Sequence, residues 1–317
     1  MTGGPIFVGG TGRSGTTIVG QLISQHRDVF PVVPTELRIF TDRRGLIDLL
    51  ATVRASREPS LVRRLLRRPR RRRRAAGPTP EEFVDEFRSH WYGTVARDGT
   101  PRGLRLSGLE LAAFEPLLAG FPDRVRKRPL EASRRFARDL IATLAPDAGR
   151  WVETTPGNAG RAPGLLELFP DLRLVHVVRD GRDTAASIAT MIWGPHEIFE
   201  ALAWWADRMH EAYAALERMP PERAFTIRLE DLLVRDRETN YERIRTGTDL
   251  APDARMRAFF DATMTPERGH VGRWQSQLDD RDAAARFDRL YRQHLTRLRE
   301  RFGPVPPTED LDQPPLA

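Results

Sequence analysis

A short stretch near the start of the chain combines glycines, hydroxyls and an arginine in an order suited to binding an anion. Residues 6–19 read IFVGGTGRSGTTIV, an apolar run followed by a glycine-rich turn and a helical pattern. Glycines let backbone N–H groups turn toward one point, and the N-terminus of the next helix adds the positive end of its dipole. The hydroxyls of Ser14, Thr16 and Thr17 are further donors, and Arg13 is a fixed cation. The stretch therefore predicts a cradle for a phosphate or sulfate group.

The cradle differs from the loop of nucleotide-hydrolysing enzymes in the position of its cation. That loop reads G-x-x-x-x-G-K-[ST]. Gly10 and Gly15 keep its glycine spacing, but Thr16 stands where the lysine would be, and Arg13 brings positive charge from upstream. This disfavours ATP or GTP chemistry, although a P-loop kinase stays an alternative.

A second junction between an apolar run and a helical pattern carries another arginine and another hydroxyl. Residues 172–187 read LRLVHVVRDGRDTAAS, with Arg179 at the end of the run and Ser187 eight residues later. The carboxyl ends of parallel strands open onto one crevice, so each junction can hold one phosphate end of a nucleotide. For Arg182 and Asp183, a competing interpretation is a surface ion pair that closes a helix start.

The elements that must position these junctions alternate along the chain. Five short apolar stretches are expected to be strands: 5–9, 29–33, 150–153, 173–178 and 224–229. Helical patterns cover residues 15–25, 80–95, 131–144, 161–169, 184–192, 196–217 and 283–301. This alternation predicts an α/β fold, with a P-loop-type parallel sheet flanked by helices. Trp204 and Trp205 lie in one of these helical patterns and are expected in the core.

One domain is predicted over residues 1–302. Strand signals are nearly missing from about residue 46 to residue 146, which we interpret as a helical cap inserted into the domain. Residues 303–317 are rich in proline and acid and are expected to be poorly ordered.

The net charge of +7 comes from one local run of nine arginines within residues 63–74, because the rest of the chain is slightly acidic (7 − 9 = −2). Such a run is typical of a solvated segment, so nucleic-acid binding is not expected. A non-enzymatic nucleotide- or RNA-binding module, using the cradle and this run, is the third hypothesis. No apolar run is long enough to span a bilayer and no secretory signal is visible, so a cytoplasmic protein without a membrane partner is expected. The sequence does not indicate an oligomeric state.

The motifs resemble those of the sulfotransferase family, and most closely its bacterial and tyrosylprotein-type branch, whose loop reads P-R-S-G-T-T. Stretches similar to that family also occur at residues 151–156 and 227–233. The resemblance implies that the donor is 3′-phosphoadenosine 5′-phosphosulfate, and that 3′-phosphoadenosine 5′-phosphate is the product. Its 5′-phosphosulfate would be held by Gly12, Arg13, Ser14, Gly15, Thr16 and Thr17.

The resemblance also assigns the other end of the donor. Arg179 and Ser187 would bind the 3′-phosphate, and Arg268 and Gly269 belong to a late loop that clasps the nucleotide. The sequence departs from the family pattern twice near these residues. Gly12 replaces a proline, and the first basic residue of the late loop is replaced by an acid.

Sulfuryl transfer of this kind needs a cation at the leaving group and a base for the acceptor hydroxyl. Arg13 is the expected cation, and no metal is expected. The tyrosylprotein-type branch uses a glutamate shortly after the first helix, which corresponds to Glu36, whereas cytosolic members use a mid-chain histidine, for which His90 is the candidate. Arg38 is expected on the substrate side. A competing interpretation is that Glu36 caps the next helix behind Thr35. The acceptor, whether a small molecule, a sugar or a peptide tyrosine, is not indicated.

Overall fold

The computed structural model describes residues 3–57, 77–95, 102–146, 148–278 and 280–312, so the arginine run lies outside the described residues. The chain forms two compact units. The first unit comprises Met1–Pro31, Gly149–Pro163 and Asp171–Ala317, and the second comprises Val32–Ala148 and Gly164–Pro170. The range predicted as one domain is thus divided between two units, and the expected helical cap falls within the second.

A five-stranded parallel sheet forms the centre of the first unit. Its strands are β1 (Ile6–Gly10), β2 (Phe30–Pro31), β3 (Trp151–Glu153), β4 (Arg173–Val178) and β5 (Ala224–Arg228), in the order β2-β3-β1-β4-β5. Every neighbouring pair is parallel, and Gly10 of β1 lies opposite Val177 of β4. The predicted α/β fold is confirmed. The second strand is shorter than predicted and lies at an edge, where a proline costs least because it has no N–H to donate.

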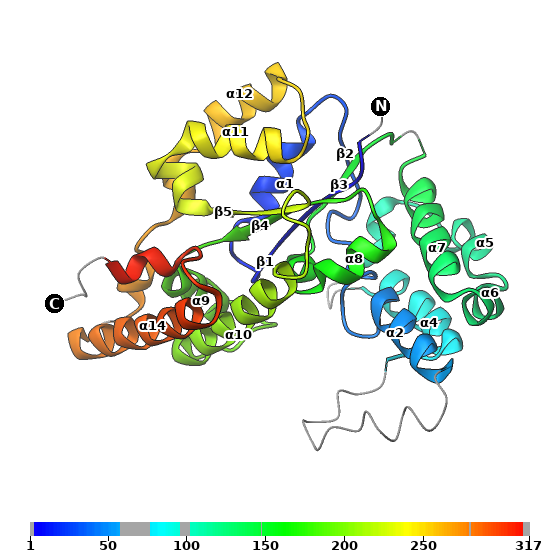
Figure 1. Ribbon diagram of the computed structural model, residues 1–317, viewed down its shortest axis with the longest axis horizontal. Coiled ribbons are helices and arrows are strands. Elements are labelled where there is room, and N and C mark those ends of the chain that lie inside the picture. Colours follow the sequence, from blue (N-terminus) through cyan, green and yellow to red (C-terminus); the bar gives the residue numbers. More distant parts are fainter. Residues whose placement is uncertain (1–2, 58–76, 96–101, 147, 279, 313–317) are drawn as a thin grey trace. The chain divides into compact units, whose positions relative to one another are not determined.

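Helices cover both faces of this sheet (Figure 1). On one face lie α1 (Thr16–Ser24), α11 (Arg237–Gly247) and α12 (Ala254–Thr263), and on the other lie α9 (Gly181–Ala189), α10 (Ile198–Leu216) and α14 (Arg281–Phe302). Each face has its own apolar core. Val175 and Val177 of β4 share the first core with Phe260, while Trp205 and Phe287 belong to the second. Trp205 is buried as expected, but Trp204 is only half-buried.

Shorter elements complete the first unit. They are a 3-10 helix at Pro156–Arg161, helix α8 (Ala162–Leu168), which continues into the second unit, a π-helical turn at Asp231–Arg235, helix α13 (Pro266–Gly269), and 3-10 turns at Arg273–Gln277 and Thr308–Asp312. Among the described residues, none of the helices combines the length and the apolar character needed to cross a bilayer.

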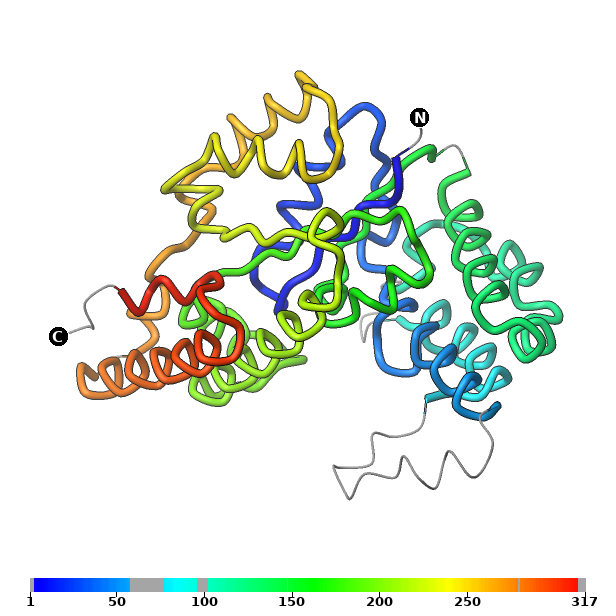
Figure 2. Tube along the Cα trace, viewed as in Figure 1, coloured from blue at the N-terminus to red at the C-terminus, as the bar shows by residue number. Residues whose placement is uncertain are grey.

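The second unit is helical in its described residues. The chain enters it after β2 and leaves it before β3 (Figure 2). Its helices are α2 (Leu46–Arg57), α4 (Pro80–Glu86), α5 (Glu115–Leu118), α6 (Phe121–Lys127) and α7 (Pro129–Leu144), with a π-helical turn at Phe87–Tyr92 and 3-10 turns at Gly103–Ser107 and Leu111–Ala113. Aromatic rings fill its core, where Phe83 and Phe121 both pack on Phe136 with ring centroids 5.5 and 4.7 Å away.

The end of the chain packs on the first unit through a buried carboxylate. Asp310 is 5% exposed, lies 2.8 Å from a guanidinium nitrogen of buried Arg228, and accepts a hydrogen bond of 2.7 Å from the hydroxyl of Tyr291. The prediction of poor order therefore does not hold for residues 303–312. A buried arginine requires carboxylate partners, and two of them, Glu309 and Asp310, come from this segment.

We expect Asp310→Ala to lower the free energy of unfolding by about 3 kcal/mol, because it leaves the buried Arg228 guanidinium short of a partner. Asp312→Ala is the matched control, since Asp312 forms an exposed pair with Arg299 and its loss should change little. Urea denaturation of both variants measures the difference. Equal, small effects would show that the C-terminal segment does not stabilise the fold.

Candidate active site

The two predicted anion-binding junctions meet because β1 and β4 are neighbouring parallel strands. In their register, the last residue of β1, Gly10, pairs with Val177 near the end of β4, so both strands end at the same edge of the sheet. From the loop after β1, Nε of Arg13 donates to Oγ of Ser187 at 2.9 Å, across 174 residues of sequence. Arg179, directly after β4, donates from Nη1 to the carbonyl oxygen of Arg13 at 3.3 Å. The structure thus brings Arg13, Arg179 and Ser187 together, while their roles in binding stay predictions.

The cradle loop, residues 11–15, has an unusual backbone. Gly12, Arg13 and Gly15 all adopt left-handed conformations, with φ of 82°, 57° and 99°. This conformation costs a residue with a side chain about 1–2 kcal/mol, so glycine is favoured at two of the three positions. Gly12 also cannot be the proline of the family pattern, because the proline ring holds φ near about −65°.

Gly15 has a second reason to be glycine. A Cβ atom at this position would lie 2.7 Å from Cδ1 of Leu229, which is far inside contact distance. Because residue 15 has no side chain, the N-terminus of α1 can pack directly against Leu229, which follows β5. The loop can therefore hold its N–H groups in a fixed arrangement.

Several buried polar atoms around the two junctions have no hydrogen-bond partner among the described residues. They are Oγ of Ser14, Oγ1 of Thr184 and Nε of Arg179. Leaving such groups unpaired costs about 1–3 kcal/mol each. Thr16 is also buried, whereas Thr17 and Arg13 are exposed. The site is rich in donors, as a site for an anion should be.

The late loop, residues 268–274, is fastened to the end of β4. Nη2 of Arg179 donates to the carbonyl oxygens of Gly269 at 3.0 Å and His270 at 3.2 Å. Arg268 is exposed and adjoins this clasp. Arg179 therefore links both loops through their carbonyl groups. It therefore holds the loops in place, a structural role that the sequence did not indicate.

Asp183 fixes the same loop from α9. Its carboxylate accepts from the N–H groups of Gly272 at 2.8 Å and Trp274 at 3.0 Å. Burial raises the pKa of Asp183, and these two N–H groups act in the opposite direction. The predicted ion pair with Arg182 is wrong, because Arg182 pairs with Asp180 and Asp288 instead.

A buried acid supports the end of β4 from the neighbouring strand. Oε1 of Glu230 accepts from the backbone N–H of Asp180 at 2.8 Å, and Oε2 lies 3.2 Å from Nε of Arg228. Asp180 in turn caps α9 by accepting from the N–H of Arg182. Glu230 belongs to the stretch 227–233, which the family resemblance marked without a role. A carboxylate directly after a strand beside the site was the available signal.

Glu36 and Arg38 lie in the second unit, in the turn that precedes α2. Glu36 is half-buried, and this burial raises the pKa of its carboxyl group. The nearby charge of Asp42 also raises the pKa, whereas that of Arg38 lowers it. Nε of Arg38 lies 2.9 Å from Oδ2 of Asp42. The next helix begins only at Leu46, so the interpretation of Glu36 as its cap is wrong. The role of Glu36 as base stays a prediction.

His90, the other candidate base, is exposed on the π-helical turn Phe87–Tyr92 of the second unit. Its ring packs edge-on against Trp91, with the centroids 5.6 Å apart. This contact does not orient either ring nitrogen of His90. Of the two candidates, Glu36 has the environment that favours a base.

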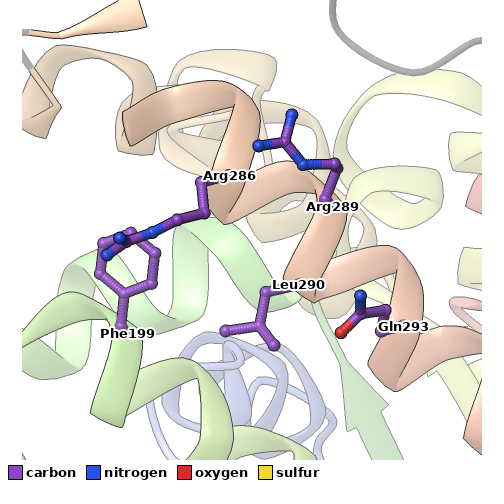
Figure 3. A pocket seen from close by; sticks show the side chains of 5 residues that line it. All are labelled: Phe199, Arg286, Arg289, Leu290 and Gln293. Carbon is purple, nitrogen blue, oxygen red and sulfur yellow. The ribbon is translucent and has the colours of Figure 1, made fainter. Parts of the chain in front are cut away.

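A separate pocket opens on α10 and α14 (Figure 3). Its lining residues are Phe199, Arg286, Arg289, Leu290 and Gln293. The guanidinium of Arg286 lies over the ring of Phe199, 4.5 Å from its centroid. None of the residues predicted to act in binding or catalysis lines this pocket.

Comparison with known proteins gives one family and several distant structures. The model of a family described as the sulfotransferase family matches residues 5–253. No curated protein matches the chain.

Three solved structures illustrate the structural likeness. The sulfotransferase domain of an olefin synthase from Synechococcus PCC 7002 is 14% identical, with 96% of this chain and 95% of that chain covered and a TM-score of 0.49. A sulfotransferase domain from the curacin biosynthetic pathway is 15% identical, with 87% and 83% covered and a TM-score of 0.45. Sulfotransferase STF9 from Mycobacterium avium is 19% identical, with 95% and 77% covered and a TM-score of 0.45.

The close approach at Gly15 can be tested by adding one methyl group. Gly108 is also left-handed, with φ of 75°, but a Cβ atom there would meet nothing within 4 Å. We expect Gly108→Ala to cost about 1–2 kcal/mol of stability, and Gly15→Ala to cost more because it overlaps Leu229. Urea denaturation gives both values. Leu229→Ala combined with Gly15→Ala should recover part of the loss, and strictly additive losses would contradict the contact.

Proposed function

The chain belongs to the sulfotransferase family, and we propose that it transfers a sulfuryl group from 3′-phosphoadenosine 5′-phosphosulfate to a hydroxyl group of an acceptor. The hydrogen bond between Arg13 and Ser187 carries this proposal, because it joins the two anion-binding junctions in one site. A nucleotide with phosphate groups at both ends of its ribose needs two such junctions.

The residues at the two junctions fit this donor in charge and in hydrogen bonding. The cradle loop and the first turn of α1 offer backbone N–H groups and the hydroxyls of Ser14, Thr16 and Thr17 to the 5′-phosphosulfate. The unpaired Nε of Arg179 and the hydroxyl of Ser187 are available to the 3′-phosphate. When bound, the donor supplies an activated sulfuryl group attached to a phosphate that can leave.

Arg13 is the residue best placed to assist the transfer. Its exposed guanidinium is held by Ser187, so the cation does not have to be ordered when negative charge grows on the leaving phosphate. Arg179 holds the carbonyl of Arg13 and thereby the loop itself. Positioning and charge stabilisation of this kind supply most of the catalysis in comparable transfers of a phosphoryl group.

Glu36 is proposed to take the proton of the acceptor hydroxyl. A raised pKa makes a carboxylate a stronger base, which suits this task. Arg38 lies two residues away and is proposed to face the acceptor. His90 is the alternative base.

The donor half of the proposal is tested by titrating the protein with 3′-phosphoadenosine 5′-phosphate in a calorimeter. We expect binding, and we expect Arg13→Ala to weaken it about tenfold or more, because a charge-assisted hydrogen bond is lost. The rate of transfer should fall about 10²- to 10³-fold in the same variant. Arg301→Ala is the control, since Arg301 pairs with Glu217 in an exposed position. Binding of ATP and not of the bisphosphate would favour a kinase.

The base is tested by Glu36→Gln, with His90→Gln as the comparison. We expect Glu36→Gln to reduce transfer to a mixture of phenols about 10²- to 10⁴-fold, with the affinity for the bisphosphate unchanged. In the unmodified protein, transfer should fall as the pH drops through the raised pKa of Glu36, because the base becomes protonated. Normal turnover of Glu36→Gln together with loss of activity in His90→Gln would assign the role to His90.

A further inference from the structure

An exposed aromatic patch borders the cradle loop within the first unit. It consists of Ile192 and Trp193, which follow α9, and Trp204 of α10. Ile192 is 85% exposed and Trp193 is 56% exposed, while Trp204 is half-buried. The two indole rings lie with their centroids 6.1 Å apart, tilted by 54°. Ile192 and Trp193 both belong to the large apolar side chains that the described part of the structure leaves exposed.

The patch contacts the cradle loop at Gly12. A Cβ atom on Gly12 would lie 3.5 Å from Trp193 and 3.9 Å from Trp204. Gly12 directly precedes Arg13, the cation proposed for the leaving group. A molecule held on the patch would therefore lie beside the group that is transferred.

The composition of the patch indicates what kind of molecule it holds. Indole faces favour planar rings, which stack on them or meet them edge-on. The guanidinium of Arg208 already lies over the Trp204 ring at 5.7 Å, so Trp193 offers the more open face. The patch comprises three side chains, far fewer than the roughly 20–30 residues that each partner contributes to a stable protein interface. Its size suits one small aromatic group.

From this geometry we propose that the aromatic patch binds the ring of a phenolic acceptor. This inference rests on the proposed sulfuryl transfer and adds the class of acceptor. In the reaction, the phenol oxygen forms a bond to sulfur while the bond from sulfur to the leaving phosphate oxygen breaks. The phenolic proton passes to the general base, and the electron pair of the broken bond stays on 3′-phosphoadenosine 5′-phosphate. Trp193 is a positioning and specificity residue in this scheme.

The test compares two probes of equal skeleton, planar 2-naphthol and saturated decahydro-2-naphthol. Both are titrated calorimetrically into the full chain in the presence of saturating 3′-phosphoadenosine 5′-phosphate. We expect the unmodified protein to bind 2-naphthol about fivefold or more tightly than the saturated alcohol, because only the planar ring can stack. Trp193→Ala should lose this preference, and Trp193→Phe should retain most of it. Phe30→Ala is the control, since Phe30 is an exposed aromatic residue, 42% accessible, on edge strand β2.

The outcomes separate this inference from the function on which it rests. If the unmodified protein binds the bisphosphate but shows no preference for 2-naphthol, or if Trp193→Ala keeps the preference, the aromatic patch is not the acceptor site and the sulfotransferase proposal stands. If Trp193→Ala weakens the bisphosphate and leaves 2-naphthol unchanged, the patch serves the donor and the inference is overturned. If the bisphosphate does not bind at all, both proposals fail.

A kinetic measurement gives a second readout. With 2-naphthol as the acceptor, Trp193→Ala should raise KM about fivefold or more and change kcat less, because the patch holds the ring and does not touch the reacting oxygen. A drop in kcat at unchanged KM would contradict a role in acceptor binding.

Discussion

Neighbouring parallel strands end at the same edge of a sheet, and β1 and β4 each end there in a loop that carries an arginine. Their pairing, with Gly10 opposite Val177, is the contact on which the rest of the candidate site depends. Arg13 and Ser187 are separated by 174 residues, so no local preference can bring them together. The register does so, and Arg179 then ties the two loops to each other and to the late loop through carbonyl oxygens. These hydrogen bonds place the arginines without a ligand, which is the condition for electrostatic preorganisation.

Buried charges underneath the site keep these strand ends in place. Glu230 holds the backbone N–H of Asp180, Arg228 pairs with Glu230, and Asp310 completes the partners of Arg228 from the end of the chain. Such pairs add little net stability, because removing charges from water offsets most of their attraction. Their value here is geometric, since each member is costly to move without its partner. The C-terminal segment, although remote in sequence, thereby supports the same edge of the sheet as the cradle loop.

The strands of the sheet and the two junctions could be predicted from the sequence, because each depends on the conformational preferences of residues that are close together in the chain. Short β-branched runs and glycine-rich turns have clear physical preferences, and the five strands and the two strand-to-helix junctions follow from them. That the two junctions share one edge follows from the general rule for the ends of parallel strands. Contacts between distant segments could not be predicted in the same way. Asp183 caps a loop 89 residues away, and Asp310 partners an arginine 82 residues earlier. The residues next to Asp183 and Asp310 in the sequence give no indication of these distant partners. The half-buried position of Trp204 was missed because an amphipathic pattern does not show how deeply a residue at the edge of the apolar face is buried.

The backbone of the cradle loop also constrains the surface around it. A left-handed residue 12 excludes proline and favours glycine, and glycine leaves the space beside the loop without a side chain. Trp193 and Trp204 approach that space to within ordinary contact distance of the Cβ atom that any other residue would carry. Glycine at this position is therefore explained by the turn, and a Cβ atom there would only touch the indole rings without displacing them. The departure from the family's proline, which by sequence alone looks like a weakened motif, is in the folded protein a requirement of the left-handed backbone at the point where the loop adjoins the aromatic patch.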